Sequence, residues 1–181
     1  DFVGGGAGRL GDAAIFSLHK MLPVEYGGLL CLNGSTSGEG FPPEDESINF
    51  LTSFDLYAIA QKRLENVVAL QNLLKKYSDE LVPLRPKLNT GEVPQTFPVF
   101  IRTVSRDKLY ELLNTAGYGV VTLYHTLIDN ISKQDFPLSH KLAKHILNLP
   151  IHQDNDPDKI TSMVECLMDC IAKLRKNGRH V

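Results

Sequence analysis

Short apolar runs alternate with longer amphipathic stretches over the second half of this sequence, and this alternation limits the possible folds more than any other feature. The short runs have the length of strands, while the stretches between them repeat apolar residues at helical spacing. Strands and helices in this order predict a small two-layer α/β domain. The strand-like runs are "TFPVFIR" (96–102), "GVVTLY" (119–124) and "LNLPI" (147–151), and the helical ones are "SRDKLYELLNTAG" (105–117), "LSHKLAKHI" (138–146) and "DPDKITSMVECLMDCIAKLRKNG" (156–178).

The ends of these helices carry signals of their own. Ser105 stands where an N-cap hydroxyl is expected, and Gly117 stands where a helix stops. Pro157 suits the first turn of the last helix, whose basic end suits the negative end of the helix dipole. A longer helical pattern runs over about 48–77, with a break or bend expected near Thr52 and Ser53.

The front of the chain follows a different pattern. Two short apolar runs predict strands, a buried one over 13–18 and a second one over 28–32. Residues 34–47 are rich in glycine, serine, proline and acidic residues, which predicts a loop or linker. We therefore expect two parts, divided into residues 1–46 and 47–181.

Composition argues against two classes of partner. The net charge is −2, and aromatic residues do not interleave with basic ones, so we expect no nucleic-acid partner. No apolar run approaches the roughly 20 residues of a membrane helix, and the first residues show no signal-peptide pattern. We expect no membrane association and a cytoplasmic location.

The cysteines and histidines predict no metal site. The three cysteines, Cys31, Cys166 and Cys170, form an odd and sparse set, which favours a reducing compartment over a disulfide framework. Cys166 and Cys170 have no histidine at ligand spacing, so core or half-buried thiols are the better interpretation. His140 and His145 lack the spacing of one helix face.

The segment "GAGRLG", Gly6 to Gly11, satisfies the pattern G-x-G-x-x-G. In a dinucleotide site this pattern follows a strand and opens a helix, whose N-terminus holds the pyrophosphate. Here the glycines precede the strand-like run "DAAIFSL" (12–18). A surface loop is therefore the better interpretation.

A lysine stands at the end of the first predicted strand. The segment "FSLHKMLPVEYGG" (16–28) places Ser17, His19 and Lys20 just before a turn with two glycines. Partial burial there would favour a neutral amine, which a Schiff-base lysine requires. The hydroxyl and the imidazole can donate hydrogen bonds to an anion, and the glycines let the backbone approach a ligand. The alternative is an ordinary solvated lysine.

This group of residues resembles the site of fold-type I pyridoxal-phosphate enzymes, and among them the DegT/DnrJ/EryC1/StrS aminotransferases. The resemblance implies an α/β fold: the end of a fold-type I PLP-transferase large domain, followed by the small α/β C-terminal domain. The segments that carry it are "GRLGDAAIFSLHKMLPVEYGGLLCLN" (8–33), "QKRLENVVALQNLL" (61–74) and "LNLPIHQDNDPDKITSMVECL" (147–167).

The resemblance implies a role for each polar residue of the front segment. Lys20 would hold pyridoxal 5′-phosphate as a Schiff base and then move a proton between substrate and cofactor. Ser17 would bind the cofactor phosphate. His19 would lie near that phosphate, or simply hydrogen-bond within the turn. The Ser-x-x-Lys spacing is shorter than the Ser-x-x-x-x-Lys of many sugar aminotransferases, which leaves the substrate open.

Three further residues are candidates for substrate binding. His125 stands roughly where the family places a substrate-facing histidine after a strand, and a partly buried structural histidine is the alternative. Arg102 ends a predicted strand, where its guanidinium could bind a carboxylate or simply face solvent. Tyr26, beside the glycine pair, could reach a ligand or pack against its neighbours.

Other cofactor-binding groups of the family have no counterpart among these 181 residues. In the family, an acidic partner for the pyridine nitrogen, an aromatic residue stacked on the ring and a phosphate-binding loop lie upstream of the lysine strand. Asp12 cannot be that acid, because it lies in the approach to the lysine strand itself. We therefore expect this chain to be the C-terminal part of a longer protein.

Two functions remain open from the sequence. The resemblance implies a pyridoxal-phosphate aminotransferase that works as a homodimer. It would move an amino group from an amino-acid donor to a keto acceptor such as a nucleotide-linked keto sugar. A lyase or dehydratase on the same scaffold is a variant of this hypothesis. The alternative is a catalytically inactive small domain that acts as a partner or regulatory module.

Overall fold

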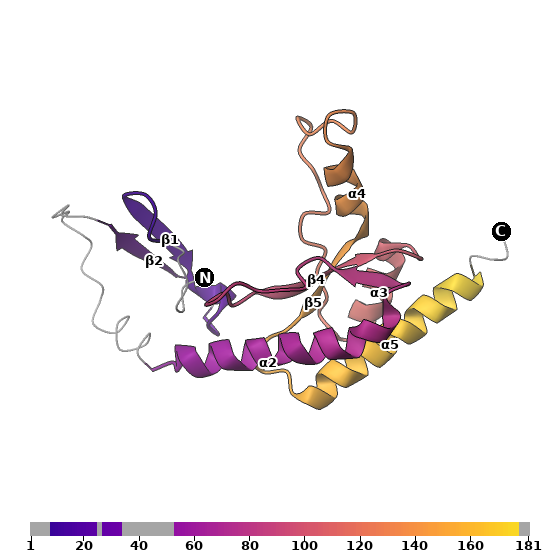
Figure 1. Ribbon diagram of the computed structural model, residues 1–181, viewed down its shortest axis with the longest axis horizontal. Helices are drawn as coiled ribbons and strands as arrows, with labels where there is room; N and C mark the ends of the chain where they lie inside the picture. Colours follow the sequence, from indigo (N-terminus) through magenta and orange to yellow (C-terminus); the bar gives the residue numbers. More distant parts are fainter. Residues whose placement is uncertain (1–7, 25–26, 34–52, 178–181) are drawn as a thin grey trace. The chain divides into compact units, whose positions relative to one another are not determined.

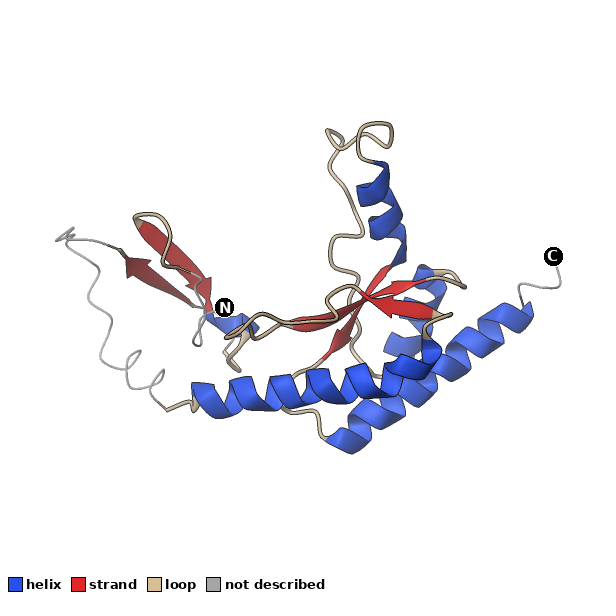
Figure 2. Cartoon of the chain, viewed as in Figure 1, coloured by secondary structure: helices blue, strands red, loops and turns tan. Residues whose placement is uncertain are grey.

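A computed structural model of the chain describes residues 8–24, 27–33 and 53–177 (Figures 1 and 2). Helices and strands are mixed along the chain, so the predicted α/β class is confirmed. None of the helices in the described part has the length and apolar character that crossing a membrane requires. In chain order the elements are β1 (Ala13–Ser17), η1 (Leu18–Lys20), β2 (Gly28–Leu32), α2 (Leu56–Leu74), η2 (Lys75–Tyr77), β3 (Leu81–Pro83), β4 (Thr96–Ile101), α3 (Arg106–Thr115), α4 (Pro137–His145), β5 (Ile146–Pro150) and α5 (Pro157–Asn177).

The chain divides into two compact units, which we describe one at a time. The first unit comprises Asp1–Leu64 and Leu88–Gln95, and the second comprises Glu65–Lys87 and Thr96–Val181. The domain boundary that the sequence predicts, between residues 46 and 47, lies outside the described residues. That division therefore stays a prediction.

In the first unit, β1 and β2 pair as an antiparallel ladder that runs from Ala13↔Leu32 to Ser17↔Gly28. Both strands lie where the sequence predicts them, but exposed and half-buried side chains alternate along them. Ile15, for example, is 80% exposed. The prediction that the first of them is buried is wrong for the described structure, because a two-stranded ladder covers little of its own faces.

The second unit is built on an antiparallel sheet with the strand order β3-β4-β5. Helix α3 packs against α5 and β5, and α4 contacts β4 (Figure 2). Helices and sheet thus bury one apolar core between them, as expected for a two-layer α/β domain. The side chains with no exposed surface in this unit are Leu70, Leu81, Val99, Ile101, Leu109, Leu113, Leu147, Leu149, Ile151 and Leu167.

The central strand β4 contains a proline, which lacks the amide hydrogen that a central strand uses. Pro98 lies opposite Asn148 in the register, but Asn148 makes its backbone hydrogen bonds with Val121, at 2.8 and 3.1 Å. On the other side, the carbonyl of Pro98 accepts a hydrogen bond from Leu84, just beyond β3. The amide hydrogen that Pro98 lacks therefore belongs to the last position of the β3–β4 ladder. Its absence interrupts no further hydrogen-bonded pair of residues in that ladder.

The segment 119–124, predicted as a strand, forms only an isolated bridge. Val121 pairs with Asn148, and the remaining residues of the segment are not part of a strand. Gly119 and Tyr124 have positive φ angles of 61° and 62°. The strand prediction is wrong because extended backbone cannot continue through such positions, whatever the apolar pattern between them.

The predicted ends of α3 and α5 are confirmed. Ser105 is the N-cap of α3, and its hydroxyl accepts a hydrogen bond from the backbone nitrogen of Lys108 at 3.4 Å. Gly117 follows the end of α3 with φ +87°, the left-handed conformation typical of a helix stop. Helix α5 begins at Pro157 and carries basic residues in its last turn.

Helix α2 is shorter than the pattern over 48–77 predicts. It begins at Leu56. The side chain of Asp55, the residue before it, accepts a hydrogen bond from the backbone nitrogen of Ala58 at 2.9 Å. The last predicted turn is a 3-10 turn at Lys75–Tyr77. Residues 48–52 lie outside the described residues. Ser53 lies in a turn just before α2, where the sequence predicts a break or bend.

Candidate functional site

The chain turns tightly where β1 ends, and Lys20 lies within this turn. The backbone nitrogens of Met21 and Leu22 both donate to the carbonyl of Leu18, at 3.0 and 2.9 Å. Leu18 and Leu22 are buried on one side, while His19 and Lys20 are exposed. Residues 17–22, which we call the lysine turn, thus use two leucines as anchors and present an imidazole and an amine to solvent.

Ser17 is the last residue of β1 and occupies the N-cap position of the 3-10 turn. A capping role would be the simplest structural explanation for a serine here. Its side chain makes no capping hydrogen bond, however, and the residue is exposed. The hydroxyl is therefore placed at the strand end without a part in closing the turn.

The two glycines after the lysine turn are explained by the hairpin itself. Gly27 has φ +118°, and its carbonyl accepts a hydrogen bond from the backbone nitrogen of Leu18 at 3.3 Å. A Cβ atom at Gly28 would lie 3.3 Å from the carbonyl oxygen of Phe16 across the ladder. The described structure thus assigns these glycines a structural role, while Tyr26 lies outside the described residues.

Lys20 is exposed, so the partial burial predicted for it is not found in the described structure. Its amine is accessible to a carbonyl compound, and Ser17 and His19 supply a hydroxyl and an imidazole within the same short stretch. These are groups that can condense with an aldehyde and hydrogen-bond an anion. The residues present in the turn therefore fit pyridoxal phosphate in chemical type.

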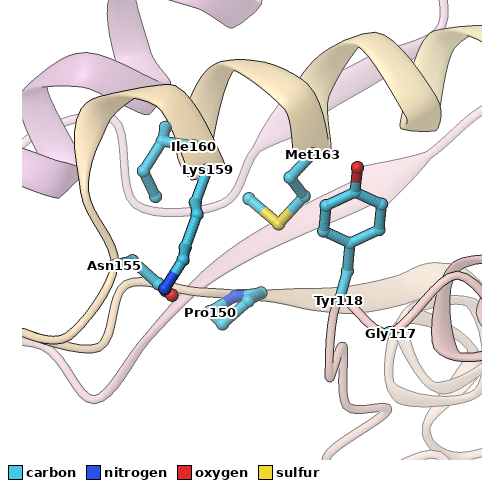
Figure 3. Close-up of a pocket in the computed structure, with 7 residues that line it drawn as sticks. All are labelled: Gly117, Tyr118, Pro150, Asn155, Lys159, Ile160 and Met163. Atoms are coloured by element: carbon cyan, nitrogen blue, oxygen red, sulfur yellow. The ribbon is translucent and has the colours of Figure 1, made fainter.

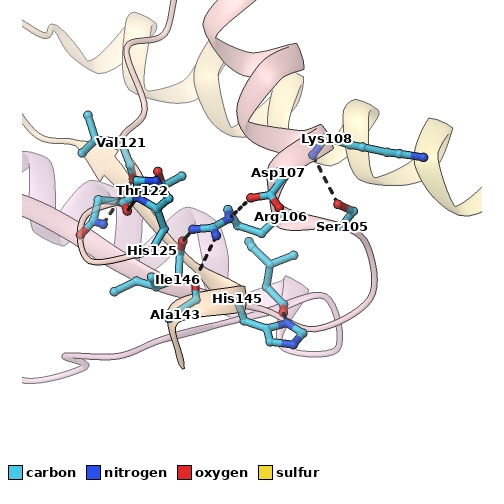
Figure 4. Close-up of polar contacts among 12 residues, drawn as sticks. Ser105, Arg106, Asp107, Lys108, Val121, Thr122, His125, Ala143, His145 and Ile146 are labelled. Atoms are coloured by element: carbon cyan, nitrogen blue, oxygen red, sulfur yellow. Dashed lines mark hydrogen bonds and ion pairs between the residues drawn. The ribbon is translucent and has the colours of Figure 1, made fainter. Parts of the chain in front are cut away.

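The other two sequence candidates lie in the second unit. Arg102 follows β4 and is exposed, and its backbone nitrogen donates to the carbonyl of Glu80 at 2.8 Å. His125 is also exposed, and its Nδ1 lies 2.8 Å from the carbonyl oxygen of Thr122 (Figure 4). The partly buried structural histidine that the sequence left open is therefore not found at His125.

Tyr124, next to His125, was not singled out from the sequence. Among the described residues it is the one non-glycine residue with positive φ, and its side chain is 81% exposed. A tyrosine in this conformation carries a strain of roughly 1 kcal/mol or more, and such strain is enriched at functional sites. No pattern in the sequence predicts it. The residue lies in a tight turn that is closed by a hydrogen bond from the backbone nitrogen of His125 to the carbonyl of Thr122, at 3.0 Å.

Asn66 was also missed, although it connects two of the segments that carry the family resemblance. It is buried in α2, and its Nδ2 donates to the carbonyls of Ile151, His152 and Asn155, at 3.4, 2.9 and 3.3 Å. These carbonyls belong to the turn between β5 and α5. A single amide thus holds that turn against the helix.

The two thiols on α5 are core or half-buried, as the sequence predicts. Cys166 is half-buried and Cys170 is buried on α5. Burial raises the pKa of the Cys170 thiol, and the neighbouring Cys166 raises it further by a smaller amount. His140 and His145 each approach a backbone carbonyl, at 2.6 and 2.7 Å. In the described ranges, no three histidine, cysteine or acidic side chains gather as metal ligands.

A pocket of about 200 Å³ in the second unit is a second candidate site (Figure 3). Figure 3 shows the Lys159 amine near Asn155 and the Tyr118 ring beside Met163. Burial, with smaller effects from Cys166 and Glu165, raises the pKa of Tyr118, so its hydroxyl is not a base near neutral pH. The described lining of the pocket includes no carboxylate and no imidazole, and we rank the pocket below the lysine turn as a candidate site. Its lining is Gly117, Tyr118, Pro150, Asn155, Lys159, Ile160 and Met163.

Solved structures similar to this chain share its fold. The structure of DesI, determined in the presence of its TDP-sugar product, is 20% identical, with a TM-score of 0.72 over 96% of this chain and 53% of DesI. DesV of S. venezuelae, in complex with a ketimine intermediate, is 15% identical, with a TM-score of 0.70 over 90% of this chain and 53% of DesV. A putative sugar aminotransferase from Streptococcus pneumoniae, in its PLP-form, is 13% identical, with a TM-score of 0.68 over 93% of this chain and 54% of its own.

The chain therefore spans about half the length of these structures. No curated protein sequence matches it. A model of one protein family does match, over residues 54–168, which is more than half of the 181 residues. This range includes α2, the whole sheet of the second unit and most of α5. The chain belongs to the DegT/DnrJ/EryC1/StrS aminotransferase family.

Proposed function

We propose that this chain is part of a pyridoxal-phosphate-dependent aminotransferase and that Lys20 is its catalytic lysine. The observation that carries the proposal is the lysine turn, in which two buried leucines leave Lys20 exposed at the end of β1. Family membership supports the reaction class. It also favours an enzyme over an inactive partner or regulatory module.

Each polar residue of the lysine turn has a task in this proposal. The Lys20 amine would hold the cofactor through its aldehyde, and would carry a proton to or from the substrate α-carbon. The Ser17 hydroxyl would donate a hydrogen bond to the cofactor phosphate, and the His19 imidazole would serve the same anion. Bound pyridoxal phosphate supplies an electron sink for the cleaved C–H bond.

The proposed substrates are a small amino-acid donor and a keto acceptor. One turnover converts the donor amine to a ketone and the acceptor ketone to an amine, so no external oxidant is needed. The product named for DesI is a TDP-sugar, which supports a nucleotide-linked keto sugar as acceptor. His125, Arg102 and Tyr26 remain our candidates for contacts with these substrates, and the strain at Tyr124 supports the segment around His125.

We also propose that β1 and β2 close the large domain of a longer protein. Their apolar side chains, such as Ile15, are exposed in the described structure, as expected for strands that pack within a larger domain. In the same proposal residues 1–46 end that domain, residues 47–181 form the small domain, and the enzyme is a cytoplasmic homodimer. Light scattering of the purified full-length protein would report its oligomeric state.

A half-reaction tests the proposed function directly. The full-length protein is loaded with pyridoxal phosphate and mixed with single amino acids, and the keto acid and pyridoxamine phosphate formed are quantified. We expect equal amounts of both products with at least one donor. An acceptor panel of simple keto acids and nucleotide-linked keto sugars then identifies the second substrate. Absence of both products with every amino acid would contradict the proposal.

Ser17→Ala is expected to weaken cofactor binding while the fold is kept. A hydrogen bond to a charged group is worth roughly 1.5–3 kcal/mol, so the Kd for pyridoxal phosphate should rise about ten- to a hundredfold. Equilibrium titration of the apoprotein measures this change. Ser105→Ala is the matched control, because Ser105 caps α3 and should affect stability alone. Equal cofactor affinity of Ser17→Ala and wild type would contradict the role of Ser17.

A further inference from the structure

A buried arginine contacts the lysine turn from α2. The Nη2 of Arg63 donates a hydrogen bond to the backbone carbonyl of Lys20 at 3.1 Å, although the two residues are 43 positions apart. Arg63 is 1% exposed, which is unusual for a side chain that carries a permanent charge. A buried guanidinium is tolerated only where hydrogen bonds replace those it had made with water.

Arg63 occupies a position on α2 where an apolar residue would be expected. The buried residues Ala60, Val67, Leu70 and Leu74 follow α2 at helical spacing, and Arg63 falls on the same stripe. A leucine or methionine at this position would fill the space without the desolvation of a charge. Packing alone therefore does not explain the arginine, whereas its contact with the lysine turn does.

We infer that Arg63 is a positioning residue for Lys20. This inference rests on the proposed function, because it assigns to Arg63 the task of holding the backbone from which the reactive amine extends. The two hydrogen bonds to the carbonyl of Leu18 stabilise the turn from within, and the Arg63 hydrogen bond holds it at the carbonyl of Lys20. A small displacement of a reacting group can lower a rate by up to about a hundredfold. Arg63 acts through Lys20 and makes no proposed contact with the cofactor.

Two measurements on the full-length apoprotein separate positioning from a general effect on the fold. The first is the rate of covalent attachment of pyridoxal phosphate to the protein, followed by the absorbance of the lysine-bound cofactor. The second is the affinity for pyridoxamine phosphate, which has no aldehyde and so binds without reacting with Lys20. In Arg63→Met we expect attachment to slow by about tenfold or more, with pyridoxamine phosphate affinity within about twofold of wild type.

Arg63→Lys keeps the charge and one donor, so an intermediate attachment rate is expected. It also carries the test if Arg63→Met does not fold. The matched control is Arg106→Met in the second unit. Arg106 is likewise buried, and it donates to the backbone carbonyls of Ala143 and Ile146, both at 2.9 Å (Figure 4). We expect this variant to lose thermal stability but to keep the wild-type attachment rate.

The possible outcomes distinguish the two proposals. Unchanged attachment in the folded Arg63 variants would overturn the positioning role. So would a parallel loss of attachment and pyridoxamine phosphate affinity in both the Arg63 and the Arg106 variants, which would indicate a general effect on the fold. A wild-type protein that attaches no cofactor at all would overturn the proposed function and this inference with it.

Discussion

Replacing Lys20 by alanine is expected to abolish covalent attachment of pyridoxal phosphate and to reduce amino transfer by at least about a thousandfold. The amine that condenses with the aldehyde is lost, and the group that moves the proton at the substrate α-carbon is lost with it. The fold should be unaffected, because the Lys20 side chain is exposed and the turn is held by backbone hydrogen bonds. Absorbance of the lysine-bound cofactor and a steady-state assay measure the two effects.

Lys159→Ala is the matched control for this prediction. Lys159 is also exposed, and it lines the pocket of the second unit that is the competing candidate site. We expect this variant to attach cofactor and to transfer amino groups as the wild type does. An inactive Lys159→Ala variant together with a fully active Lys20→Ala variant would contradict the prediction, and would place the functional site at the pocket of the second unit.

Asn66→Ala is expected to lower the free energy of unfolding on the order of 3 kcal/mol. The substitution removes the amide that donates to three carbonyls in the turn between β5 and α5. Leaving a buried carbonyl without its donor costs roughly 1–3 kcal/mol. The contact with Ile151 is buried, and those with His152 and Asn155 are part-buried. Urea unfolding followed by circular dichroism measures the change.

Asn72→Ala on the same helix is the control for Asn66. Asn72 is exposed, and its side chain accepts a hydrogen bond from Lys75 at 2.8 Å. A surface substitution of this kind changes stability by about 0.5 kcal/mol or less. Equal stability of the two variants would show that the Asn66 contacts do not hold the turn.

Local patterns were enough to predict most elements of the second unit. The apolar periodicity over 105–117 and 156–178, together with the N-cap at Ser105 and the proline at 157, located α3 and α5 closely. The same reasoning failed for 119–124, where positive φ angles override an apolar pattern typical of strands. It also missed β3, which is short and lies directly after a turn.

The candidate site shows a similar limit. The sequence placed Ser17, His19 and Lys20 together, because neighbours in the chain remain neighbours in a turn. It could not predict that Lys20 is exposed, since exposure depends on what packs against β1. Nor could it find Arg63 or Asn66, whose partners lie 43 and more than 80 positions away and obey no local spacing.

The central claim is that Lys20 is the lysine that carries the cofactor. Borohydride reduction of the full-length protein loaded with pyridoxal phosphate, followed by digestion and mass spectrometry, locates the attachment residue. The account predicts a phosphopyridoxyl group on Lys20 in the peptide that contains the lysine turn. A modified lysine elsewhere, such as Lys159, or no modified lysine in a protein that transfers amino groups, would contradict it.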